Sequence, residues 1–161
     1  MTTMEMFLSW MNDAYAMEVA AGDLSKRYSD DVEKYPELQA KFRDMAKRSE
    51  SKAEQLKGMI DTLGGDTSKA KTAIGKLGSM YQSAMSELMH DQVVKHMLVS
   101  YSGASLGIAS YHSLAAAAKE LGHTEVVSFA EECMTASKEF CSWLEKEIPK
   151  TTVQFLKEEH T

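Results

Sequence analysis

The hydrophobic positions of this chain recur in alternating steps of four and three residues, a spacing that places side chains on one face of an α-helix. Four long segments show this pattern: residues 3–29, 36–63, 91–121 and 124–147. Pro36 suits the first turn of the second segment. We expect Pro149 to end the fourth helix and to leave residues 148–161 as a short tail. The pattern therefore predicts four long helices.

The connection between the second and third helices is the least regular part of the chain. Residues 68–90 show a weak helical pattern that Gly75 and Gly78 interrupt, so we expect a crossover with one or two short helices. A long crossover lets the two helices that it joins run in the same direction. The sequence therefore predicts one all-α domain over residues 1–161: a ferritin-like four-helix bundle with a short C-terminal extension, which packs over one end through Val153, Phe155 and Leu156.

The third helix is built largely from small residues between Ser100 and Ala118. Small side chains let a neighbouring helix come close, or they leave space between the helices. If space is left, a small apolar ligand could bind there, as in other pockets between the helices of a bundle. The residues expected to line such a pocket are Tyr101, Ala104, Gly107, Tyr111 and Ser137.

Two charged residues fall on faces that are otherwise apolar. Glu18 lies on the stripe of the first helix and Lys52 on that of the second, at a similar depth in two antiparallel helices. An unpaired buried charge is costly, so we predict a buried ion pair between them, joined by the hydroxyl of Tyr101 or Tyr111. The alternative is that Lys52 extends to the surface along its aliphatic stem and leaves Glu18 hydrated or paired elsewhere.

Ferritin-like bundles commonly hold two metal ions with a Glu from each of two helices and a Glu-x-x-His motif from each of the other two. At the corresponding depth this chain offers one carboxylate, Glu18, and Lys52 would repel a cation. We therefore expect no cofactor; iron or manganese would be the metal if the site were retained. Glu87-Leu88-Met89-His90 is a literal Glu-x-x-His motif, but it lies at the end of the crossover and is predicted to be solvated.

Composition limits the partners and the location. A net charge of −6 argues against nucleic acid, because phosphate binding needs a basic face. No apolar run is long enough to span a membrane, and no basic segment marks a signal peptide. Cys133 and Cys141 lie eight residues apart on one predicted helix, about 12 Å along its axis, too far for a disulfide. We expect reduced thiols and a cytoplasmic protein.

Several of these motifs resemble the YciE/YciF family of bacterial ferritin-like proteins. The run from Ala118 to Glu125 is similar to that family's turn between the third and fourth helices. The run from Asn12 to Tyr15, followed by Glu18, resembles its first-helix motif. The second helix matches through Glu50, Glu54, Leu56, Leu63 and Gly64, and the resemblance covers Met4 to Glu147.

The resemblance implies a compact bundle, often dimeric and linked to bacterial stress responses, with a di-metal centre like that of rubrerythrin. This chain departs from the family at the ligand positions. Arg48 and Lys52 replace ligands on the second helix, the third helix reads Ala104-Ser105-Leu106-Gly107, and the fourth reads Thr135-Ala136-Ser137. These replacements argue against metal binding and oxidase activity.

Three functions follow from these observations. The favoured one is a non-catalytic ferritin-like domain that has lost di-metal binding and acts by association, as a homodimer or with a protein partner. The second is a metal-binding or oxidase-type protein of the rubrerythrin-like class. The third is a protein that binds a small apolar ligand beside the small residues of the third helix.

Overall fold

The structure is a computed structural model that describes residues 1–86 and 92–159. Its elements are α1 (Thr3–Asp31), α2 (Pro36–Thr62), the 3₁₀ helix η1 (Thr67–Ala70), α3 (Lys71–Ser86), α4 (Gln92–Leu121) and α5 (Thr124–Glu159). Neither described part contains a strand. The predicted all-α class and its long helices are confirmed, and α3 and η1 are the short helices expected in the crossover.

The ends of the helices carry the sequence signals that define them. Thr2 caps α1: its hydroxyl accepts the backbone N–H of Glu5 at 3.1 Å, and the Glu5 side chain accepts the N–H of Thr2 at 2.6 Å. Pro36 occupies the first turn of α2. Gly64 and Gly122 follow α2 and α4 with φ values of +82° and +78°, a left-handed conformation that glycine adopts without strain.

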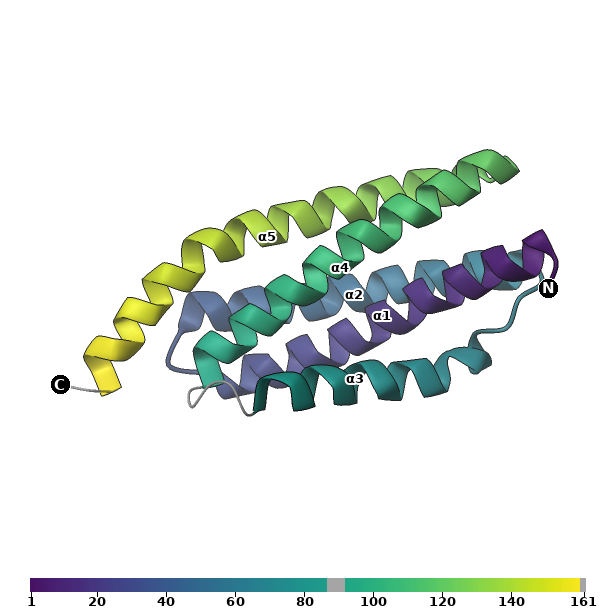
Figure 1. Ribbon diagram of the computed structural model, residues 1–161. Coiled ribbons are helices and arrows are strands. Elements are labelled where there is room, and N and C mark those ends of the chain that lie inside the picture. The colour runs from purple at the N-terminus through teal and green to yellow at the C-terminus, as the bar shows by residue number, and fades with distance from the viewer. Residues whose placement is uncertain (87–91, 160–161) are drawn as a thin grey trace.

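The helices form two antiparallel pairs with a fifth helix on the outside. Figure 1 shows α1 beside α2 and α4 beside α5, with α3 running along α1 at the edge of the bundle. α4 crosses α1 and connects the two pairs, whereas α3 meets α4 only sparsely. The middle of α4 is therefore not fully covered, and residues such as Leu106 reach the surface.

The prediction that Pro149 ends the fourth helix is wrong, because α5 continues through it to Glu159. Proline removes a helical hydrogen bond and crowds the carbonyl four residues before it, and α5 bends in its C-terminal part (Figure 1). Side-chain contacts hold the helix beyond the proline. The Thr151 hydroxyl donates to Glu147 at 3.0 Å, and the Lys150 ammonium donates to Glu37 of α2 at 2.7 Å.

The last turns of α5 pack over the end of the bundle only in part. Phe155 contacts the neighbouring hydrophobic cluster, as expected. Val153 and Leu156 do not follow the prediction, since they are 49% and 55% exposed. The two side chains lie on a helix that extends past the bundle, which leaves them without a neighbouring helix to cover them (Figure 1).

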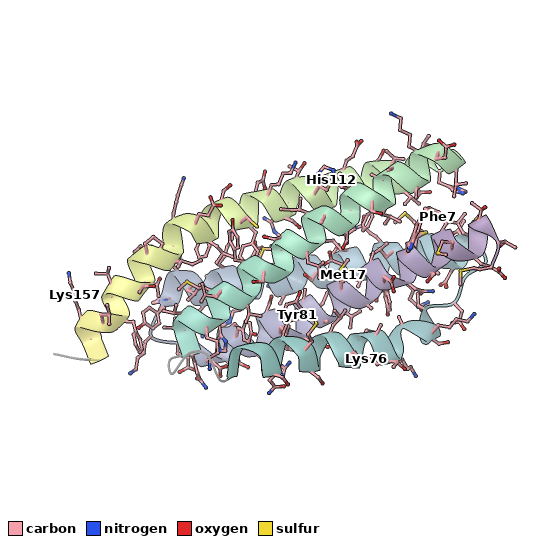
Figure 2. The ribbon with its side chains drawn as sticks, in the orientation of Figure 1. Phe7, Met17, Lys76, Tyr81, His112 and Lys157 are labelled. Atoms are coloured by element: carbon pink, nitrogen blue, oxygen red, sulfur yellow. The ribbon has the colours of Figure 1, made fainter. Side chains whose placement is uncertain are left out.

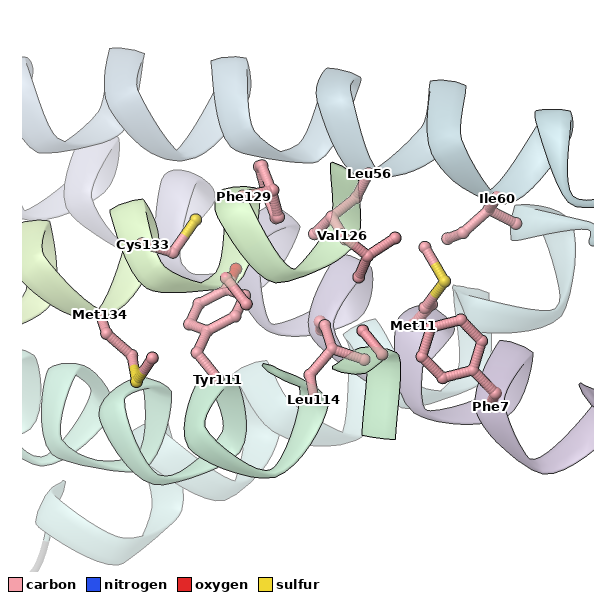
Figure 3. Packing of buried hydrophobic residues seen from close by; sticks show 13 residues of the cluster. Phe7, Met11, Leu56, Ile60, Tyr111, Leu114, Val126, Phe129, Cys133 and Met134 are labelled. Carbon is pink, nitrogen blue, oxygen red and sulfur yellow. The ribbon is translucent and has the colours of Figure 1, made fainter. Parts of the chain in front are cut away.

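The core consists of two hydrophobic clusters, one toward each end of the bundle. The N-terminal half of α1 contributes Phe7 and Met11 to the first cluster, which also contains Leu56, Ile60, Tyr111, Val126 and Phe129 (Figure 3). The second lies at the other end and contains Leu24, Val32, Phe42, Met97 and Leu144. Small and polar residues separate the two clusters. No helix in the described parts is long and apolar enough to cross a membrane.

Candidate functional site

A cavity of about 100 Å³ lies in the middle of the bundle, against the second hydrophobic cluster, which supplies part of its lining. All five α-helices contribute to its lining. Met17 of α1 and Tyr81 of α3, labelled in Figure 2, mark its position along the bundle. Its walls are mostly apolar, with two charged side chains, Glu18 and Lys52, among them.

Glu18 is held by a short hydrogen bond. Its side chain is 8% exposed, and its Oε1 accepts the hydroxyl of Tyr111 of α4 at 2.6 Å. Burial, and then the neighbouring Glu18 charge, raise the pKa of Tyr111 well above its ordinary value, so the tyrosine keeps its proton and acts as the donor. No second hydrogen bond to Glu18 is formed within the described part of the chain.

Lys52 lines the same cavity as Glu18. The ion pairs with an N–O distance of 4.0 Å or less in the described ranges do not include Glu18 and Lys52. Lys52 is only partly buried and also lines an open groove between α2 and α5. The tyrosine contact that we expected for Glu18 comes from Tyr111, and a direct pair between Glu18 and Lys52 stays a prediction.

Cys133 of α5 completes the polar group around Glu18. The thiol is 2% exposed and interacts with the Tyr111 hydroxyl. Burial raises its pKa to about 11, although the positive charge of Lys52 acts in the opposite direction. Burial also raises the pKa of the Cys141 thiol, which is 7% exposed. Both cysteines are therefore protonated and unreactive at neutral pH.

The other residues predicted to line a pocket divide between the cavity and its surroundings. Ala104, Gly107 and Ser137 line the cavity, and the Ser137 hydroxyl is the nearest side-chain atom to Gly107. Tyr111 lies behind the wall, bonded to Glu18. Tyr101 points outward and donates to Glu145 at 2.7 Å on the surface.

The sequence did not indicate the outer wall of the cavity. This wall is lined by Leu77 and Tyr81 of α3. Both residues belong to the crossover, where the hydrophobic periodicity is too weak to predict which face of the helix points inward. A second polar cluster was also missed: the His96 ring stacks on Tyr28 at 3.7 Å between centroids and contacts Asp31 at 2.9 Å. A histidine and an aspartate 65 residues apart carry no local signal of this contact.

The residues around the cavity do not fit a pair of metal ions. Across the described ranges, no three His, Cys, Asp or Glu side chains come together in a way that could hold a metal. The cavity itself offers one carboxylate, which Tyr111 already binds, and an ammonium group. Neither a protonated thiol nor a serine hydroxyl replaces the missing carboxylates as a ligand for iron or manganese. The Glu87–His90 motif lies outside the described residues.

Comparisons with known proteins agree with this fold. A family described as a domain of unknown function (DUF892) matches residues 2–157. A solved structure of a protein from Xanthomonas campestris pv. campestris is 26% identical, with a TM-score of 0.83 over 99% of this chain and 100% of that one. A ferritin-like, diiron-carboxylate protein from Bacillus anthracis is 17% identical, with a TM-score of 0.73 over 92% of this chain and 99% of that one. The ferritin-like fold is therefore confirmed.

Proposed function

We propose that this chain, which belongs to the DUF892 family, is a ferritin-like protein that has lost di-metal binding and acts by association with other molecules and not by redox catalysis. The observation that carries the proposal is the donor set in the middle of the bundle. Glu18 is the one carboxylate among the described residues that line the cavity, Tyr111 binds it, and Lys52 lines the same cavity. A metal pair needs several carboxylates, and a nearby ammonium opposes the binding of any cation.

Loss of the metal ligands is compatible with a stable bundle, because other residues have taken over their positions. The Tyr111 hydroxyl donates to Glu18, and the surrounding positions are occupied by residues without charge: Ser49, Ala104, Gly107 and Ser137. The resemblance to the YciE/YciF family supports a stress-related role, and the two cysteines that cannot bridge each other support a cytoplasmic location; both are part of the proposal.

Association as a homodimer is supported by apolar side chains on the surface of α1. Met4, Met6 and Trp10 are 37%, 39% and 43% exposed, and Met6 and Trp10 are neighbours one helical turn apart. A cluster of this kind is typical of an interaction surface. Light scattering should give twice the mass of one chain, and Trp10→Ser should lower the measured mass toward that of the monomer. A measured mass equal to that of one chain for the natural protein would exclude the homodimer.

The metal proposal is tested on protein purified without chelator. We expect less than a stoichiometric amount of iron or manganese by elemental analysis, and no acceleration when ferrous iron is oxidised in air. Glu18→Gln and the exposed control Asp23→Asn should then retain the same trace of metal. About two equivalents of metal that disappear in Glu18→Gln but persist in Asp23→Asn would show a working di-metal centre and overturn the proposal.

A further inference from the structure

We propose that the central cavity binds a small neutral molecule with an apolar body and one hydroxyl group, and that this hydroxyl donates to Glu18. The inference goes beyond the proposed function, although it rests on the absence of a metal pair, because a metal bound at Glu18 would occupy the same space.

The size of the cavity sets the size of the ligand. Its volume is about 100 Å³. One water needs about 10–15 Å³ measured with a probe sphere, and an engineered apolar cavity of about 150 Å³ takes up benzene. The space here therefore suits a molecule of about four to six non-hydrogen atoms.

The walls determine the polarity of the ligand. Leu24, Met45, Val99 and Phe140 form an apolar lining that favours a hydrocarbon body. Three serines, Ser25, Ser49 and Ser137, also belong to the lining, and these residues are 9%, 5% and 8% exposed. No hydrogen bond within the described chain uses any of the three hydroxyls. A hydroxyl can donate one hydrogen bond and accept others, so these three groups are free to bond a ligand that can form hydrogen bonds.

Glu18 requires a donor and the local charge excludes an ion. Its carboxylate has room for about four donors and receives one, from Tyr111. A charged ligand would be repelled by one of Glu18 and Lys52 while the other attracts it, and it would also lose its hydration on entering the cavity. A neutral hydroxyl avoids both penalties and forms a charge-assisted hydrogen bond with the carboxylate.

An entry route exists between α3 and α4. Leu106 lines the cavity and is 41% exposed, so the lining reaches the surface there. Gly103 and Gly107 on the same side of α4 carry no side chain that would close the opening, and a Cβ atom at Gly103 would find only the ring of Tyr81 within 4 Å. The site is therefore accessible without unfolding of the bundle.

Cyclopentanol is the probe that fits this description. Methylcyclopentane has the same size without the hydroxyl, and cyclopentylammonium carries a positive charge. Binding is followed by the backbone amide signals of Gly103 and Gly107 in ¹H–¹⁵N spectra, with Gly58 as an internal reference because its position has no neighbour within 4 Å. We expect saturable shifts at Gly103 and Gly107, and at least about tenfold weaker binding of methylcyclopentane, the factor that a hydrogen bond to a charged group supplies.

A matched pair of variants locates the binding. Ala104→Leu fills the cavity and should abolish the shifts, whereas Ala109→Leu, the same change at an exposed position of α4, should leave them unchanged. If Ala104→Leu fails to fold, Glu18→Met should remove the preference for cyclopentanol over methylcyclopentane. Equal binding of the two probes, tighter binding of cyclopentylammonium, or no saturable shift would each overturn the proposal.

Metal content is measured on the same sample. Stoichiometric metal would overturn the proposed function. Metal-free protein that does not respond to cyclopentanol would overturn the ligand proposal alone.

Discussion

The hydrogen bond between Tyr111 and Glu18 should be one of the most sensitive contacts in the molecule. Tyr111 is 1% exposed, and its hydroxyl lies 2.6 Å from a carboxylate that is itself buried. Tyr111→Phe keeps the ring in the first hydrophobic cluster and removes only the donor. Hydrogen bonds to charged groups contribute about 1.5–3 kcal/mol, and removal leaves a buried carboxylate without a donor from the described chain.

We therefore expect Tyr111→Phe to lower the free energy of unfolding by about 1.5–3 kcal/mol at pH 7. For a domain of this size each kcal/mol corresponds to about 2–4 °C, so the melting temperature should fall by about 3–12 °C. The measurement is urea unfolding followed by circular dichroism, with an unchanged slope in denaturant as the sign that only stability has changed.

Tyr101→Phe is the matched control. It removes the same atom from the same helix, and that hydroxyl also donates to a glutamate, Glu145, at 2.7 Å. The contact lies on the surface, where water replaces the lost partner, so no measurable change is expected. Equal effects of the two substitutions would refute the reasoning. So would additive effects of Tyr111→Phe and Glu18→Gln in a double-mutant cycle, because contacting partners should show coupling.

Other predictions test the rest of the structure. Burial raises the pKa of Cys133 from 9.0 to about 11, so the contribution of the protonated thiol to stability is complete below pH 9 and is lost as the pH rises through 11. The free energy of unfolding, measured from pH 8 to 11.5, should therefore decline, and the decline should be smaller in Cys133→Ala. An aromatic disulfide reagent should label neither cysteine of the native protein at pH 8 but both after unfolding, and native labelling of Cys133 would contradict its burial. Gly107→Ala should raise the free energy of unfolding by about 0.5–1 kcal/mol, because alanine favours the helix and its Cβ would lie 3.6 Å from Ser137, an ordinary contact. Gly64→Ala should lower the free energy of unfolding, because alanine is strained at the φ of +82° found there. Leu56→Ala, at a fully buried position, should cost about 2–5 kcal/mol in urea unfolding, and a cost below 1 kcal/mol would place Leu56 outside the core.

The fold could be predicted because the chain repeats one pattern over long segments. Phe7, Met11, Ala14 and Glu18 lie on one stripe of the first predicted helix, and all four are buried. Pro149 was the exception. Proline is a probable helix boundary in a sequence, but side-chain contacts made by Lys150 and Thr151 hold the helix together beyond it. Such contacts join residues far apart along the chain or depend on a geometry that the sequence does not display.

The site could be predicted only in part, for a related reason. Periodicity placed Glu18 and Lys52 at the same depth, and both line the cavity. Periodicity does not say which of several polar groups on facing helices will form the closest contact. In the structure the rigid ring of Tyr111 brings its hydroxyl to Glu18, while Lys52, with a long and flexible stem, lies between the cavity and an outer groove.

The separation of the core into two clusters explains how this bundle can keep its fold while its centre changes. Among the described residues each cluster contains 13 that are buried, and full burial of a large apolar side chain contributes about 1.5–3 kcal/mol. An empty apolar cavity of about 100 Å³ costs on the order of 2 kcal/mol, close to the contribution of a single core side chain. Substitutions of the small lining residues of the middle layer therefore cost little compared with those in the clusters, whereas loss of the Tyr111–Glu18 hydrogen bond is costly. The ends of the bundle fix the arrangement of the helices, so the residues of the middle layer can change without loss of the fold, as the proposed loss of metal binding requires.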